Sequence, residues 1–116
     1  METTELPQSL RRVLDRFIWA FSPERIVLFG SYAKGTNRPD SDVDLLIITD
    51  LFGDPGVTIR RARQLAANCF PSVDVAFATP EEVACATIAD NPFLASIVGS
   101  GISVYQREPR TAKKFR

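Results

Sequence analysis

Three aspartates and a Gly-Ser pair are the residues of this sequence whose types and spacing suit chemistry. Asp42 and Asp44 stand one residue apart at the start of an apolar run, and Gly30-Ser31 directly follows an earlier apolar run. In a strand, residues i and i+2 point to the same face, with Cα atoms about 6.6 Å apart. Two such carboxylates at about 4 Å repel by about 4 kcal/mol at an effective dielectric near 20. A cation is therefore expected between them, and oxygen donors favour Mg²⁺ or Mn²⁺.

A third carboxylate, Asp74, lies in a run over residues 72–78 that alternates between apolar and small or polar side chains. This alternation predicts a strand with Asp74 on the less apolar face. If this strand lies beside the one that begins at Asp42, the three carboxylates share one face of the sheet. Three carboxylates can hold two divalent ions about 3.5–4 Å apart, an arrangement that serves phosphoryl transfer. Asp74 would then lie near the attacking hydroxyl, where a general base is needed.

Two common loop motifs match these segments only in part. Residues 40–44 imitate the start of a calcium loop, but Leu45 and Leu51 stand where that loop needs Gly and Glu. Residues 30–35 have the glycine spacing of a phosphate loop, but the Lys-Ser/Thr that should follow is absent. A Gly-Ser pair at a helix start still suits phosphate oxygens. The alternative without chemistry is that the acids only solubilise strand ends and that Gly-Ser is only a turn.

Composition limits the classes of protein to consider. The chain has 116 residues, 45% of them hydrophobic and 24% charged, with 14 basic and 14 acidic side chains and no His. These values predict one globular domain and argue against disorder and against nucleic-acid binding by charge. The lack of His excludes Ser-His-Asp and Cys-His catalysis and His-ligated zinc.

Cys69 and Cys85 are expected to be buried, reduced thiols. With no signal peptide or membrane span in the sequence, a cytoplasmic protein is expected.

The periodicity of apolar residues predicts alternating helices and strands. A helix over 57–68 is expected to turn Ile59 and Ala62 inward, and Ser31 is expected to cap one helical turn that ends at Gly35. The class predicted is α/β (α+β), a small mixed sheet flanked by helices, with a domain over 1–106 and a basic tail over 107–116. The other expected elements are helices over 6–21, 80–89 and 92–98, strands over 25–29, 42–49 and 72–78, and an edge strand over 102–105.

The segment from Phe29 to Leu45 resembles a known family. Gly30-Ser31, ten residues and then Asp42-x-Asp44 is similar to the signature of the DNA polymerase β-like nucleotidyltransferase superfamily, and the fuller string resembles its minimal nucleotidyltransferase (MNT) branch. The resemblance covers nearly the whole chain and implies the polymerase β palm-like fold. The chain departs from many relatives by carrying Tyr32 and Lys34 where those relatives have Arg.

The resemblance also implies an activity and partners. Family members transfer a nucleotidyl group from ATP or another NTP to a hydroxyl with two Mg²⁺ ions. MNT proteins are typically antitoxins of helical HEPN-domain toxins, and some of them AMPylate a toxin tyrosine. A hetero-oligomer or dimer is expected, with no membrane and no direct nucleic-acid contact. The alternatives are an antitoxin that only masks its toxin and a subunit of an aminoglycoside-type nucleotidyltransferase. By resemblance, Asp42, Asp44 and Asp74 are catalytic metal ligands, and Gly30, Ser31, Lys34 and Ser41 bind the nucleotide.

Helix 6–21 carries more apolar surface than a single buried stripe requires. Ile18, Trp19 and Phe21 stand together near its end. We expect this helix, or the segment 91–105, to contact another chain.

Overall fold

The computed structural model describes residues 8–50, 53–69, 72–87 and 89–107. The elements occur in the predicted order and confirm the predicted class; the expected helix start at 6–7 and tail residues 108–116 lie outside the described residues. No helix in the described ranges is long and apolar enough to cross a membrane. The elements are α1 (Gln8–Phe21), β1 (Arg25–Phe29), α2 (Ser31–Lys34), β2 (Val43–Ile48), α3 (Pro55–Leu65), β3 (Val73–Ala78), α4 (Pro80–Cys85), α5 (Pro92–Ser100) and β4 (Ile102–Gln106).

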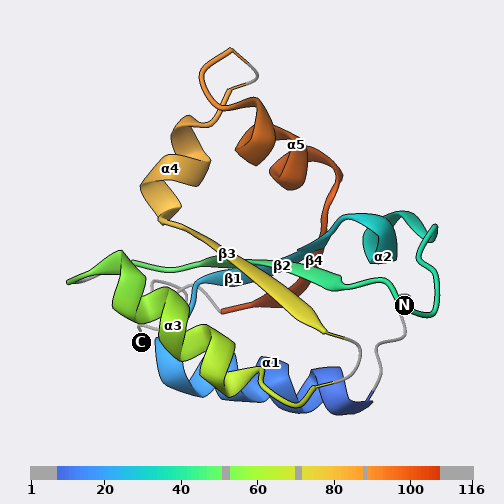
Figure 1. Cartoon of the computed structure of the whole chain (residues 1–116). Coiled ribbons are helices and arrows are strands. Elements are labelled where there is room, and N and C mark those ends of the chain that lie inside the picture. The colour runs from blue at the N-terminus through green and yellow to red at the C-terminus, as the bar shows by residue number, and fades with distance from the viewer. Residues whose placement is uncertain (1–7, 51–52, 70–71, 88, 108–116) are drawn as a thin grey trace, which may run out of the picture.

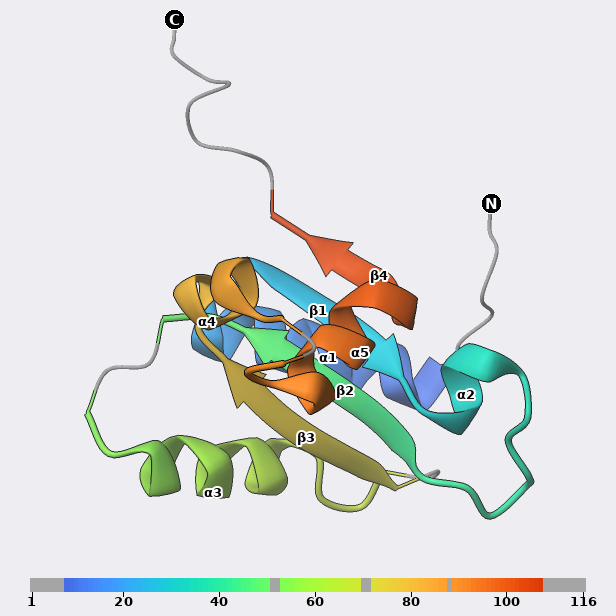
Figure 2. The same cartoon turned by 90° about the horizontal axis from the view of Figure 1, so that it is seen from above.

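The four strands form one mixed sheet in the order β3-β2-β1-β4. β1 is antiparallel to both β2 and β4, whereas β2 and β3 are parallel. β4 is an edge strand, as predicted, and the view from above shows the strands side by side (Figure 2). The amino ends of β2 and β3 and the carboxyl end of β1 therefore meet at one end of the sheet.

Helices cover both faces of the sheet, α1 and α3 on one side and α4 and α5 on the other (Figure 1). β2 serves both sides because alternate residues of a strand point to opposite faces. Val43, Leu45 and Ile47 belong to the larger core with α1 and α3, whereas Leu46 and Ile48 belong to the smaller core with α5. The buried residues of the larger core are Leu10, Val13, Leu14, Phe17, Ile26, Leu28, Val43, Leu45, Ile47 and Ala62.

Several local expectations are corrected. α3 starts earlier than predicted because the Asp54 side chain accepts a hydrogen bond from the Gly56 N–H (2.9 Å) and caps the helix. Its buried side centres on Ala62, with Thr58 and Leu65 half-buried, which leaves Ile59 at the margin and 37% exposed.

The helix predicted over 80–89 also ends early. It stops at Cys85 because Ala86 is extended, while Thr79 caps its start as expected. Cys69 is half-buried and Cys85 is exposed, and both are free, so the expectation of buried thiols was wrong although the expectation of reduced thiols agrees.

Candidate active site

The turn from β1 into α2 forms one side of the candidate site. Gly30 has φ 77° and ψ −153°, a conformation that is essentially confined to glycine. It occupies the N-cap position without a capping side chain, so Ser31 is the first helical residue and not the cap that the sequence predicted. The first N–H groups of α2 thus donate no hydrogen bond to a capping side chain. Gly35 ends the helix in the left-handed conformation, as predicted.

The pairing of β2 with β3 brings two of the aspartates together. Asp44 lies directly opposite Asp74 in the parallel register, and laterally paired residues of adjacent strands point to the same face. The expectation that the strand of Asp74 lies beside that of Asp44 is therefore confirmed. Asp42 stands two residues before Asp44, just ahead of β2, and is exposed like Asp74.

The electrostatics identify Asp44 as the centre of this trio. Partial burial raises the pKa of its carboxyl above the ordinary 3.8, and the negative charges of Asp74 and then Asp42 raise that pKa further. Both neighbours are therefore close enough to destabilise the ionised form of Asp44. Mutual repulsion among like charges at one site is the condition that a bound cation relieves.

Gly30 lies against the carboxylate of Asp44. A Cβ atom added at Gly30 would overlap Oδ2 of Asp44 and crowd its Cγ. Phe29, the residue before Gly30, is the antiparallel partner of Asp44. The Gly30 backbone and the aspartates therefore belong to one site, and glycine is required there for space as well as for conformation.

The donor set fits a hard divalent cation because it consists of carboxylate oxygens. Within the described ranges, no three His, Cys, Asp or Glu side chains are gathered as a ready-made metal cluster. Asp44 is the member that both other carboxylates act upon. An ion here would have to draw the exposed side chains of Asp42 and Asp74 towards Asp44.

The remaining predicted nucleotide-binding residues occupy the segment that leads from α2 to Asp42. Lys34 is exposed at the last position of α2, and Ser31 is half-buried at its first. The Ser41 hydroxyl accepts a hydrogen bond from the Arg38 backbone N–H (2.7 Å) and so holds the turn that precedes Asp42. Contacts of these side chains with a nucleotide stay predictions.

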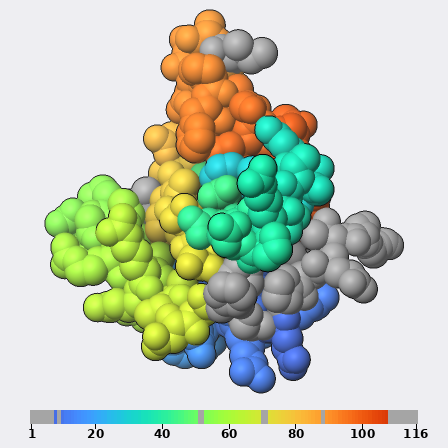
Figure 3. All heavy atoms as spheres, turned by 45° about the vertical axis from the view of Figure 1, so that its right-hand side comes forward, coloured from blue at the N-terminus to red at the C-terminus, as the bar shows by residue number. Residues whose placement is uncertain are grey.

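Two aromatic residues beside the aspartates were missed by the sequence analysis. Phe29 and Phe93 form an edge-to-face pair with ring centroids 6.0 Å apart. Phe93, in the first turn of α5, is 62% exposed. Figure 3 shows this end of the molecule, where α2 with its following loop (teal), β3 (yellow) and α5 (orange) come together. No spacing rule links these two phenylalanines, because only the packing of α5 on the sheet brings them together.

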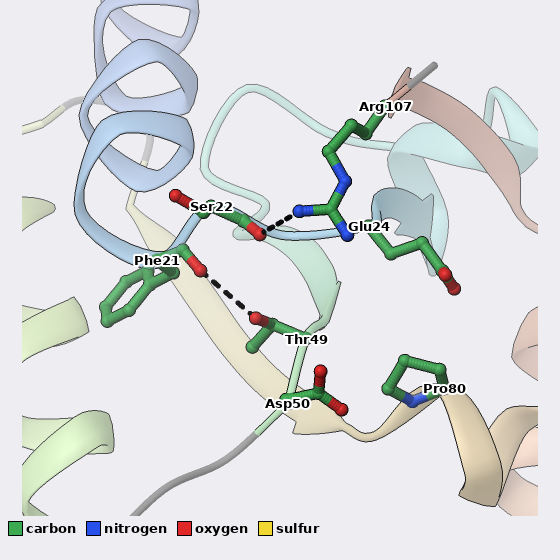
Figure 4. A pocket seen from close by; sticks show the side chains of 7 residues that line it. All are labelled: Phe21, Ser22, Glu24, Thr49, Asp50, Pro80 and Arg107. Carbon is green, nitrogen blue, oxygen red and sulfur yellow. Dashed lines mark hydrogen bonds between the residues drawn. The ribbon is translucent and has the colours of Figure 1, made fainter. Parts of the chain in front are cut away.

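A hollow of about 310 Å³ lies at the opposite end of β2, next to Thr49 and Asp50. Two hydrogen bonds close its walls: Thr49 Oγ1 donates to the Phe21 carbonyl (3.1 Å), and Arg107 Nη1 donates to the Ser22 carbonyl (3.0 Å) (Figure 4). Arg107, predicted to begin the tail, is thus attached to the fold. These bonds hold the end of α1 and the turn after it against the residues that follow β2 and β4, so we assign this hollow a structural role.

A family model described as "Nucleotidyltransferase domain" matches residues 10–98, which include every aspartate of the trio and Gly30. No curated protein gives a significant match to the sequence.

Two solved structures share the fold. One is a crystal structure of a toxin-antitoxin with AMP-PNP, 21% identical with a TM-score of 0.58, covering 88% of this chain and 76% of that chain. The other is a protein from Sulfolobus solfataricus, itself only provisionally described as a nucleotidyltransferase, 17% identical with a TM-score of 0.55, covering 86% of this chain and 79% of that chain. At these identities the likeness establishes the fold alone.

Proposed function

Because the chain belongs to the nucleotidyltransferase domain family, we propose that it transfers AMP from ATP to a hydroxyl group in a Mg²⁺-dependent reaction. The acceptor we propose is a tyrosine of a HEPN-type toxin partner. The observation that carries the proposal is the pairing of Asp44 with Asp74, with Asp42 two residues before Asp44 and with the pKa of Asp44 raised by burial and then by the charges of Asp74 and Asp42. A partly buried carboxylate beside two other negative charges lowers the stability of the fold. A protein that only binds a partner has no use for such a group, whereas a metal-dependent transferase uses it as a metal ligand.

The proposed roles follow from the order of the strands. Asp42, Asp44 and Asp74 would hold Mg²⁺, which when bound would neutralise charge on the triphosphate and on the leaving group. Asp74, on the outer strand β3, accepts the proton of the attacking hydroxyl. The hydroxyl oxygen bonds to the α-phosphorus while the bond to the α,β-bridging oxygen breaks, and pyrophosphate leaves. The backbone at Gly30 and Ser31, which lacks a capping side chain, binds the triphosphate.

The partner is proposed on two grounds. A toxin-antitoxin structure shares this fold, and α1 presents an unpartnered aromatic side chain. Trp19 is 83% exposed and borders a hollow of about 310 Å³ between α1 and α3 with Arg61 and Leu65. This surface lies on the sheet face opposite to the aspartates, so a toxin held there would leave the site open. The expected contact through α1 stays a prediction, as does the one through 91–105.

The test combines the purified chain with a helical HEPN-type toxin, ATP and Mg²⁺, and measures the intact mass of both proteins. We expect the partner's mass to rise by AMP units. Asp44→Asn should lower the rate at least about 1,000-fold, since it removes the shared ligand. Asp50→Asn is the matched control, because Asp50 is an exposed aspartate that flanks the other end of β2.

The competing function is masking of the toxin by contact alone. It predicts that neutralisation of the toxin survives Asp42→Asn, Asp44→Asn and Asp74→Asn with no change in the partner's mass. Transfer of AMP to an aminoglycoside without a protein partner would instead identify a small-molecule transferase. Either result would overturn the proposal of toxin AMPylation.

A further inference from the structure

An exposed aromatic side chain stands at the border of the candidate site. Phe93 lies in the first turn of α5, where Asn91 caps the helix by accepting a hydrogen bond from the Leu94 N–H (3.1 Å). The residue is 62% exposed, and its ring meets Phe29 edge-to-face with an interplanar angle of 87°. An exposed phenylalanine held by a second ring and a capped helix has a defined position without being part of the core.

Strand register connects this aromatic pair to the aspartates. Phe29 is paired with Asp44, and directly paired residues in antiparallel strands have side chains on the same face. Phe29 is also the residue before Gly30, whose backbone lies against the Asp44 carboxylate. Phe93 therefore stands on the acidic face, one side chain away from the central aspartate.

The other exposed large hydrophobic side chains are elsewhere. In the described part of the chain these are Trp19 on α1 and Val57 and Ile59 on α3, and both helices cover the opposite face (Figure 1). Among these exposed side chains Phe93 is thus the one beside the aspartates, which points to a ligand of that site and not to general surface hydrophobicity.

The geometry points to a nucleobase platform: we propose that the base of the bound nucleotide stacks on the exposed ring of Phe93, with Phe29 supporting that ring from the sheet. This rests on the proposed function. The strand order β3-β2-β1 places Asp74 on one side of Asp44 and Phe29 on the other. An in-line displacement places the acceptor, on the side of its base Asp74, opposite the leaving pyrophosphate on the side of Gly30 and Ser31. The nucleoside is neither the attacking nor the leaving group, so it is free to lie over the ring of Phe93, which covers the same face of the sheet.

A phenyl ring stacks on any nucleobase because every base has a π-face. The described residues of this platform offer rings and no hydrogen-bonding groups to the base edge. The platform therefore adds affinity with little discrimination between purines, and ATP and GTP analogues should bind within a few-fold of each other.

The test measures binding to the full chain, in Mg²⁺, of AMP-PNP and of inorganic tripolyphosphate by titration calorimetry. Phe93→Ala should weaken AMP-PNP binding roughly 5- to 150-fold, the range that corresponds to loss of one stacked base. Tripolyphosphate binding should change less than about two-fold, because it has no base. Phe93→Trp should retain AMP-PNP binding, and Phe93→Leu, which keeps apolar volume, should lose it as Phe93→Ala does.

Trp19→Ala is the matched control, since it removes a more exposed aromatic ring from the opposite face; it should change neither ligand. If Phe93→Ala leaves AMP-PNP binding unchanged, or weakens tripolyphosphate equally, the platform is refuted while the proposed function stands. If Phe93→Ala raises only the KM of the acceptor protein, the ring contacts the acceptor and the platform is likewise wrong. If the wild-type chain binds neither ligand, the proposed function itself fails and the platform with it.

Discussion

The two faces of the sheet differ in how completely helices cover them. On the face towards α1 and α3, the β2 side chains Val43, Leu45 and Ile47 are each 0% exposed. On the other face, α4 and α5 cover Leu46 and Ile48 but leave Asp44 half-exposed at the strand's beginning. One face is closed along its whole length, whereas the other is closed only at one end.

This difference between the faces explains how a small chain stays folded although its aspartates repel one another. Burial of apolar side chains on the closed face contributes about 1.5–3 kcal/mol for each large residue. That face anchors β2 and β3 in register, so the open end tolerates an arrangement that opposes folding locally. Stability and chemistry are thus separated by the two-residue period of a strand and not by distance along the chain.

Of the substitutions that compare the two faces, Gly30→Ala is expected to have the largest effect on activity. The new Cβ would overlap the Asp44 carboxylate, and the backbone conformation of Gly30 is strained for any other residue. We expect AMP transfer to fall at least about 100-fold, together with a loss of about 1–3 kcal/mol in the free energy of unfolding. Transfer rate and urea denaturation measure the two effects.

Gly35→Ala provides the control for backbone strain. Gly35 also has a positive φ, 76°, but a Cβ there meets nothing within 4 Å. Its substitution should cost about 1 kcal/mol of stability and leave transfer nearly unchanged. Equal activity losses in the two variants would show that the contact between Gly30 and Asp44 is unimportant.

Two neighbouring leucines of β2, one on each face of the sheet, allow the roles of the two faces to be compared by substitution. Leu45 and Leu46 are 0% and 1% exposed, and they point to opposite faces. Each Leu→Ala change should cost about 2–5 kcal/mol in the free energy of unfolding. Under native conditions Leu45→Ala should keep AMP-PNP affinity, whereas Leu46→Ala should lower it a few-fold because Leu46 packs with Leu94 and Ile97 of α5. The same affinity for both variants would contradict the division between faces.

The smallest expected effect is a pH dependence that Asp44→Asn removes. Because the pKa of Asp44 is raised in the folded chain, the folded state binds this proton more readily than the unfolded state. The group therefore stabilises the fold below its ordinary pKa, and this contribution is lost as the pH rises through the raised value. The Tm of the wild type relative to Asp44→Asn should fall from acid to neutral pH, and Mg²⁺ at neutral pH should raise the Tm of the wild type alone. If the Tm of the wild type and the Tm of Asp44→Asn change with pH in parallel, the pKa of Asp44 is not raised in the folded chain.

Much of the fold was predictable because the apolar periods are clear. Every described helix and strand was expected, and the boundaries that failed depended on local groups. The start of α3 was set by the Asp54 cap, and the end of α4 by the extended Ala86. Ile59 and Cys85 were wrongly expected to be buried because periodicity marks a helix side without saying which neighbour covers it.

The candidate site, too, has features that follow from local sequence and features that follow from the tertiary structure. The sequence by itself determined that Asp42 and Asp44 stand two residues apart and that glycine occupies position 30, since strand period and backbone freedom are local properties. Only the tertiary structure decided that Asp74 lies opposite Asp44 and that Phe93 meets Phe29. These contacts join segments far apart in the chain, and they arise from strand pairing and helix packing, which depend on the burial of the whole core.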